Sequence, residues 1–129
     1  SFKIVPICFL MQDLESSREV GNVLAKVLAG KNALIIASTD LTHYEPQRIA
    51  EEKDRKVIRA ILEMDEGLLY STIENYSISA CGYGPVISLI TAAKKLNAGK
   101  TELLCYKTSG DITGDKSAVV GYVAISFTK

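Results

Sequence analysis

A lone histidine, an aspartate and a cysteine stand in two short polar segments of this 129-residue sequence. Asp40 and His43 lie in residues 38–44, directly after an apolar run, and Cys81 lies in the glycine-rich residues 79–85. Imidazole changes its charge near neutral pH, so His43 is the natural candidate for proton transfer. Imidazole and thiolate also bind iron or zinc, so His43 and Cys81 are predicted to share a metal pocket if the two segments meet.

Both side chains have other interpretations. His43 can simply cap or pack a turn between a strand and a helix, because histidine is common at partly buried positions. Cys81 can act as a nucleophile beside His43, since the positive end of the helix expected after it favours a thiolate. It can also be a buried apolar side chain, as free cysteines often are. Cys8 and Cys105 lie inside strand patterns, and we expect both in the core.

The elements that must position these residues follow from the spacing of apolar residues, glycines and prolines. Strands are predicted at residues 2–10, 33–37, 101–108 and 117–127. Helices are predicted from a capping box at Ser16 to Gly30, over residues 47–64, after a cap at Asp65, and from Pro85 to Gly99. The order β-α-β-α-α-α-β-β begins with a βαβ unit, which predicts one α/β domain with a mostly parallel central sheet flanked by helices. The last two strands are interpreted as an antiparallel pair.

Residues 109–116 form a third polar segment, and we expect it to meet the other two at one end of the sheet. Its glycines and aspartates do not have the spacing of a calcium-binding EF-hand loop. A turn stabilised by aspartate side chains is therefore predicted. The charged run 51–56 is interpreted as the solvated face of a helix rather than as a partner site.

Composition excludes several classes of function. The formal net charge is +0, with 15 basic and 15 acidic residues, which argues against nucleic acid as a partner. No apolar run reaches the roughly 20 residues of a membrane span, so no membrane association is expected. Three cysteines form neither a zinc spacing nor an even disulfide framework, which favours the cytoplasm. The sequence starts at Ser1 within a strand pattern, so we expect a fragment or a processed product.

Three motifs in this order resemble the C-terminal half of the Memo-like family. They are residues 38–44 (STDLTHY), 81–85 (CGYGP), and 109–115 (SGDITGD) followed by 119–122 (VVGY). That family resembles the class III extradiol dioxygenases, which open catechol rings with non-haem ferrous iron. The resemblance implies that residues 1–129 are the C-terminal part of a larger α/β domain.

The same resemblance implies roles for two residues. His43 matches the dioxygenase histidine that serves as acid/base, and Cys81 stands at the place of the carboxylate ligand in the metal pocket. The two metal-binding histidines belong to the family's N-terminal half, whereas this chain contains a single histidine. The implied cofactor is thus a divalent metal, iron first, bound with that missing half and weakly or not at all by this chain alone.

Two functions are left open. One is a metal-dependent oxidoreductase, related to the extradiol dioxygenases, that acts on a small molecule in the full-length protein. The other is a non-catalytic module that binds a peptide or a small anionic ligand through loop amides and His43. A missing half also predicts an exposed sheet edge and an uncovered apolar face. These features favour self-association or pairing with that half.

Overall fold

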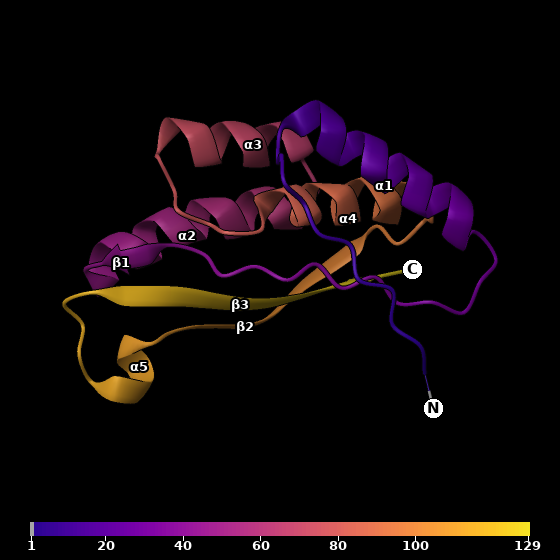
Figure 1. The fold of residues 1–129 in the computed structure, drawn as a ribbon. Coiled ribbons are helices and arrows are strands. Elements are labelled where there is room, and N and C mark those ends of the chain that lie inside the picture. Colours follow the sequence, from indigo (N-terminus) through magenta and orange to yellow (C-terminus); the bar gives the residue numbers. More distant parts are fainter. Residues whose placement is uncertain (1) are drawn as a thin grey trace.

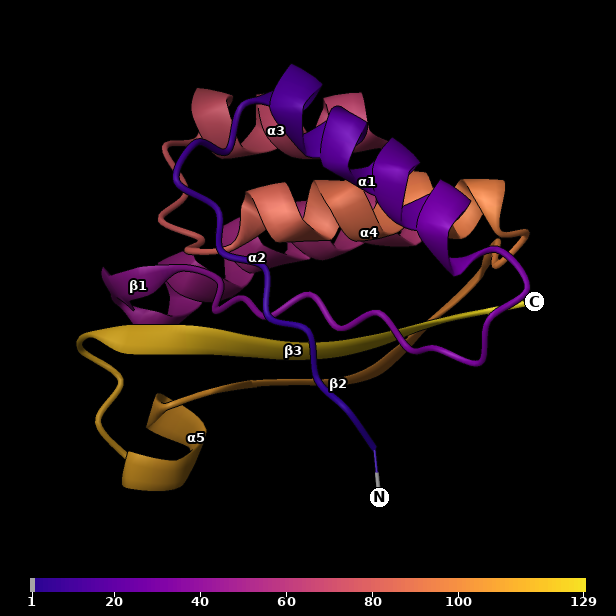
Figure 2. The same cartoon turned by 45° about the vertical axis from the view of Figure 1, so that its right-hand side comes forward.

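The computed structural model describes residues 2–129, which form a layered arrangement of helices on a small sheet (Figure 1). The elements are α1 (Leu14–Leu28), β1 (His43–Glu45), α2 (Gln47–Leu62), α3 (Glu66–Asn75), α4 (Tyr83–Lys95), β2 (Lys100–Thr108), α5 (Gly110–Thr113) and β3 (Val119–Thr128). Helices α2 and α4 lie over the sheet, and α1 and α3 form an outer layer on them (Figures 1 and 2). The protein is therefore a mixed α and β structure, as the sequence predicts.

Helices α1 and α3 each begin after an aspartate whose side chain caps the first turn. Asp13 accepts a hydrogen bond from the Ser16 amide at 2.9 Å, so α1 starts earlier than the predicted capping box at Ser16. The predicted cap at Asp65 is confirmed, because its carboxylate accepts a hydrogen bond from the Leu68 amide at 2.8 Å. Helix α4 begins at Tyr83, which places Pro85 within its first turn.

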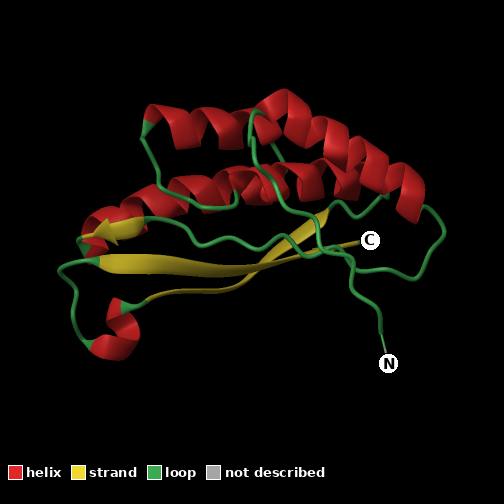
Figure 3. Cartoon of the chain, in the orientation of Figure 1, coloured by secondary structure: helices red, strands yellow, loops and turns green. Residues whose placement is uncertain are grey.

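The sheet is antiparallel, so the prediction of a mostly parallel sheet is wrong. Its strand order is β1-β3-β2, and both pairs of neighbours are antiparallel. The predicted antiparallel pairing of the last two strands is confirmed, with Thr101 opposite Phe127 and Thr108 opposite Gly121. Strand β1 is three residues long and includes His43, which the sequence placed in a loop. The yellow strands of Figure 3 show this small sheet beneath the helices.

Residues 2–10 and 33–37 are the two predicted strands that do not form. Both segments are extended coil that makes no ladder with the sheet of residues 2–129. Their apolar side chains are largely exposed: Phe2, Ile4, Val5, Ile7, Leu10, Leu34 and Ile36. A strand sequence needs a hydrogen-bonding neighbour to become a strand, and the described residues supply none here. The predicted βαβ unit is absent for the same reason.

The core lies between α2, α3 and α4 and the face of the sheet that these helices cover. Its largest fully buried side chains include Leu41, Val57, Leu69 and Ile87. Helices α1 to α4 all lie on one side of β2 and β3 (Figure 2). Cys105 is therefore exposed, and so is Cys8 in the uncovered N-terminal segment, which corrects the expectation that both lie in the core.

Candidate functional site

The two polar segments carrying His43 and Cys81 cross each other beside the N-terminus of α4. The Cys81 amide donates to the Asp40 carbonyl oxygen at 3.2 Å, and the Gly82 amide donates to Thr39 Oγ1 at 2.9 Å. In return, the Asp40 amide donates to Cys81 Sγ at 3.1 Å. The sulfur thus accepts a hydrogen bond from a backbone N–H of the neighbouring segment.

Gly82 makes this crossing possible because only hydrogen fits on its α-carbon. A Cβ built there would collide with the carbonyl oxygen of Ser38 and would lie 2.9 Å from Thr39 Cβ. The glycine therefore lets one backbone lie directly on the other. The sequence motif marked Gly82 as part of a polar loop, and the structure gives the steric reason for it.

Gln12 also holds the crossing, although no sequence pattern marks it. Its side-chain amide donates to the Cys81 carbonyl oxygen at 3.1 Å, and its Oε1 accepts from the Gly84 amide at 2.9 Å. These two hydrogen bonds join the segment before α1 to both sides of Gly82. A glutamine at the end of an apolar segment has no distinctive pattern, so this role appears only in three dimensions.

His43 is held by its backbone and faces Asp40. Its amide donates to Ser79 Oγ at 2.8 Å, which ties β1 to the segment that precedes Cys81. Its Nε2 lies 3.9 Å from Asp40 Oδ2, and its side chain is 22% exposed. The next residue, Tyr44, has a φ of 59°, and its ring meets the imidazole edge-on with 5.8 Å between centroids. His43 is therefore oriented by its neighbours and still reaches solvent.

Asp40 is the common neighbour of the other two side chains. Its amide contacts the Cys81 sulfur and its carboxylate lies near the His43 ring, so the structure brings Asp40, His43 and Cys81 to one place. An acid, an imidazole and a thiol in this arrangement can relay a proton or contribute ligands to a metal.

The third polar segment, residues 109–116, lies at the same end of the sheet as β1, as the sequence predicts, and its Lys116 carbonyl oxygen accepts from the Gln47 amide at 3.0 Å. Val120 of β3 pairs with His43 on one side, and on the other its amide and carbonyl bond Ser109. Strand β3 thus lies between Ser109 and His43. The predicted aspartate-stabilised turn is confirmed, since Asp111 accepts from the Thr108 amide at 2.8 Å and Asp115 accepts from the Ser117 amide at 2.9 Å. These bonds lower the pKa of both carboxyls.

The donor set does not make a metal centre by itself. Within residues 2–129, no group of three or more histidine, cysteine, aspartate or glutamate side chains is arranged to hold a metal ion. A stable site for iron or zinc uses at least three protein ligands, and His43 and Cys81 provide an imidazole and a thiol. Any metal bound here requires ligands that these residues do not supply.

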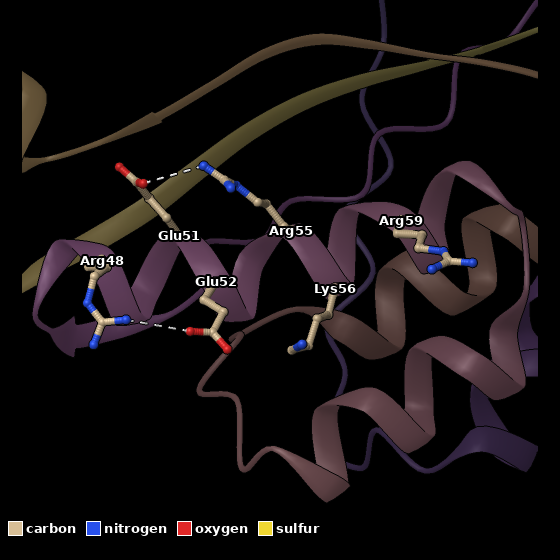
Figure 4. Close-up of a pocket in the computed structure, with 6 residues that line it drawn as sticks. All are labelled: Arg48, Glu51, Glu52, Arg55, Lys56 and Arg59. Atoms are coloured by element: carbon tan, nitrogen blue, oxygen red, sulfur yellow. Dashed lines mark ion pairs between the residues drawn. The ribbon is translucent and has the colours of Figure 1, made fainter.

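The charged outer face of α2 forms a hollow of about 470 Å³, and most of the charged side chains that line it are in ion pairs. Figure 4 shows the ion pairs Arg48–Glu52 at 3.9 Å and Arg55–Glu51 at 3.7 Å. Lys56 lies 4.9 Å from the centroid of the Tyr76 ring. Pairs of this kind along a helix are typical of a solvated surface. The interpretation of residues 51–56 as a solvated face therefore holds for Glu52 and Arg55, which are exposed, and is wrong for Asp54, which is fully buried.

The fold and the loop crossing define a mixed α and β protein that presents an acid, an imidazole and a thiol on two adjoining loops. A family model described as "Memo-like protein" matches residues 1–126. The chain is 58% identical over 125 residues to the MEMO1 family protein MJ0403 of Methanocaldococcus jannaschii, covering 95% of this chain and 44% of that protein. It is 48% identical over 131 residues to the MEMO1 family protein MK0963 of Methanopyrus kandleri, covering 100% of this chain and 46% of that protein.

The chain therefore belongs to the Memo-like family. It spans about half the length of the curated relatives it matches. Among the helices of residues 2–129, none combines the length and the apolar character needed to cross a membrane.

Proposed function

We propose that the crossing of the two loops is this chain's share of a metal pocket, in which Cys81 is a ligand and His43 an acid/base. The remaining ligands would come from the part of the longer relatives that this chain does not span, as expected if the chain is the C-terminal half of the domain. The metal would be a divalent ion, iron first, and the chemistry a redox reaction on a small molecule, related to that of the extradiol dioxygenases. The three exposed free thiols support the cytoplasm as its location.

One observation carries this proposal. The Cys81 sulfur accepts the Asp40 amide at 3.1 Å, and the carboxylate of the same residue lies 3.9 Å from His43 Nε2. A soft ligand and a proton-transfer group thus share one neighbour and reach solvent together. When bound, the metal would supply a Lewis acid at the thiol, while His43 would hold or release a proton at Nε2.

Anaerobic titration of the longer protein with ferrous iron tests the ligand assignment. Cys81→Ala should weaken binding by at least about tenfold, because a thiolate is a strong ligand for iron. Cys105→Ala is the matched control, since Cys105 is also a free, exposed cysteine but lies on β2. Equal affinities in the two variants would end the assignment of Cys81.

The competing function is a binding module that performs no chemistry and recognises a peptide or a small anion with the same loops. Assaying the longer protein with catechols separates the two functions. Turnover that His43→Ala abolishes supports the enzyme. Binding of an anionic peptide without any turnover supports the module.

We also propose a partner for the uncovered apolar segments. Residues 2–10 and 33–37 have strand sequences, extended backbones and exposed apolar side chains. The relatives are more than twice as long as the stretch they share with this chain. We assign this surface to strands from the remaining part of such a protein, which would supply the missing backbone hydrogen bonds.

Co-expression of this chain with the remaining part of a longer relative tests the pairing. A stable 1:1 complex is expected, and Ile36→Lys should weaken it. Lys31→Ala is the control, because Lys31 is already polar and exposed in the preceding turn. The assignment would be contradicted if the chain formed homodimers and the co-expressed part did not weaken this self-association.

A further inference from the structure

Asp54 is a buried carboxylate within the charged run of α2. Its exposed fraction is 0%, whereas its neighbours Glu52 and Arg55 are exposed to solvent. None of the ion pairs among residues 2–129 involves it. A buried carboxylate without a cation must be stabilised by hydrogen bonds, so its partners indicate what it does.

Three hydrogen bonds converge on Asp54 from two other elements. Its Oδ1 accepts from the Thr42 amide at 3.0 Å and from Thr42 Oγ1 at 2.6 Å. Its Oδ2 accepts from the Tyr106 hydroxyl of β2 at 2.8 Å. The carboxylate therefore connects α2, the sheet and the residue directly before His43.

The backbone around Thr42 is attached to β3 as well. The Leu41 amide donates to the Gly121 carbonyl at 2.9 Å, and the Gly121 amide donates to the Thr42 carbonyl at 3.0 Å. A Cβ at Gly121 would collide with Asp54 Oδ2, so the glycine provides the space for the carboxylate. Asp54 and β3 together fix both sides of Thr42.

We propose that Asp54 is a positioning residue that holds His43 against the Cys81 loop through Thr42. The significance of that position rests on the acid/base role proposed above for His43. An apolar side chain of similar size would fill the same volume without the cost of burying a charge. A carboxylate instead binds both the amide and the hydroxyl of Thr42, which sets the direction in which the chain enters β1.

Nuclear magnetic resonance of the full 129-residue chain tests this proposal, because His43 is its only histidine and gives one imidazole signal. Asp54→Leu should shift and broaden the His43 Cε1 signal and speed amide exchange at Thr42 by at least about tenfold, while exchange in α4 stays unchanged. Asp54→Asn retains an oxygen acceptor for Thr42 and should stay close to the parent chain. Arg55→Leu, a change at an exposed neighbour on the same helix, should alter neither quantity.

Unchanged His43 signals and Thr42 exchange in Asp54→Leu would overturn the proposal. If Asp54→Leu fails to fold, Thr42→Val decides, because it removes only the 2.6 Å hydroxyl bond and retains the shape of the side chain. A shifted His43 signal in Thr42→Val supports the proposal, and an unshifted one overturns it.

The positioning role of Asp54 and the acid/base role of His43 can be refuted independently, because the magnetic resonance measurement needs neither metal nor turnover. A displaced His43 with undiminished turnover in the longer protein would keep the positioning role and end the acid/base assignment.

Discussion

Replacing Gly82 by alanine should separate the two loops that carry His43 and Cys81. The new methyl group would collide with the Ser38 carbonyl oxygen and would lie 2.9 Å from Thr39 Cβ. One of the two backbones must move, and the hydrogen bonds Cys81 N to Asp40 O and Gly82 N to Thr39 Oγ1 are the first to lengthen. Both join segments about 40 positions apart. The same two segments are also joined by the bonds from the Asp40 amide to Cys81 Sγ and from the His43 amide to Ser79 Oγ, so a displacement at Gly82 affects the whole crossing.

The magnitude follows from these contacts. Overpacking a tight site costs about 1–3 kcal/mol, and losing one of these two hydrogen bonds costs about 1 kcal/mol more, so the free energy of unfolding should fall by about 2–4 kcal/mol. With an unfolding entropy of about 2.1 cal/mol/K per residue, each kcal/mol lowers Tm by about 4 °C in a chain of this size, so the expected decrease is about 8–15 °C.

Urea unfolding followed by circular dichroism measures this difference, with thermal unfolding as a second measurement. Gly99→Ala is the matched control, because no atom lies within 4 Å of the position its Cβ would take. If Gly82→Ala is as stable as Gly99→Ala, the two loops do not depend on the missing side chain, and the steric reasoning fails.

Three further predictions concern the scaffold. Leu41 is fully buried and Leu10 is 99% exposed, so in urea unfolding Leu41→Ala should cost about 2–5 kcal/mol and Leu10→Ala less than about 0.5 kcal/mol; equal costs would contradict the assigned core. Burial raises the pKa of Glu66, but the hydrogen bonds from Lys94 and Thr91 outweigh burial and hold this pKa below its usual 4.5. Ionised Glu66 therefore stabilises the folded chain above about pH 4.5, and this stabilisation is lost as the pH falls below about 4.5. When the free energy of unfolding is measured against pH, its decrease in acid should be smaller for Lys94→Met than for the parent chain or for the control Lys95→Met. Identical decreases in all three chains would rule out the Lys94–Glu66 ion pair as the cause. Burial and then the hydrogen bond to Asp54 raise the pKa of Tyr106 above its usual 10.0, so the parent chain should lose stability as the pH rises through and beyond about 10, and Tyr106→Phe should lose less. The control is Tyr122→Phe, at a more exposed tyrosine on β3. If Tyr106→Phe leaves the loss of stability at alkaline pH unchanged, this reasoning is refuted.

The helices could be predicted from the sequence because their signals are local. Asp65 precedes α3 as a cap, and apolar residues recur along α2 and α4 at helical spacing, so each element is specified by residues a few positions apart. The pair β2 and β3 could be predicted for a similar reason, since only residues 109–118, which include the short helix α5, separate the two strands.

The sheet order and the details of the site could not be predicted in this way. Residues 2–10 and 33–37 have strand composition, but strand formation depends on a neighbour that no local pattern specifies. Asp54 looks like one more surface charge in the run 51–56, and only the fold places it beneath Thr42 and Gly121. His43 and Cys81 could be singled out by residue type, whereas Gln12 could not.

The loop crossing also determines when the pocket can assemble as the chain folds. Its hydrogen bonds join residues 36, 41 and 69 positions apart, whereas the helix caps join residues 3 positions apart. Long closures lose more chain entropy before any contact compensates, so we expect the helices and the β2–β3 hairpin to be in place before the thiol and the imidazole meet. Substitutions at the crossing should then accelerate unfolding and leave the folding rate almost unchanged, which makes the pocket the last part of the molecule to be completed.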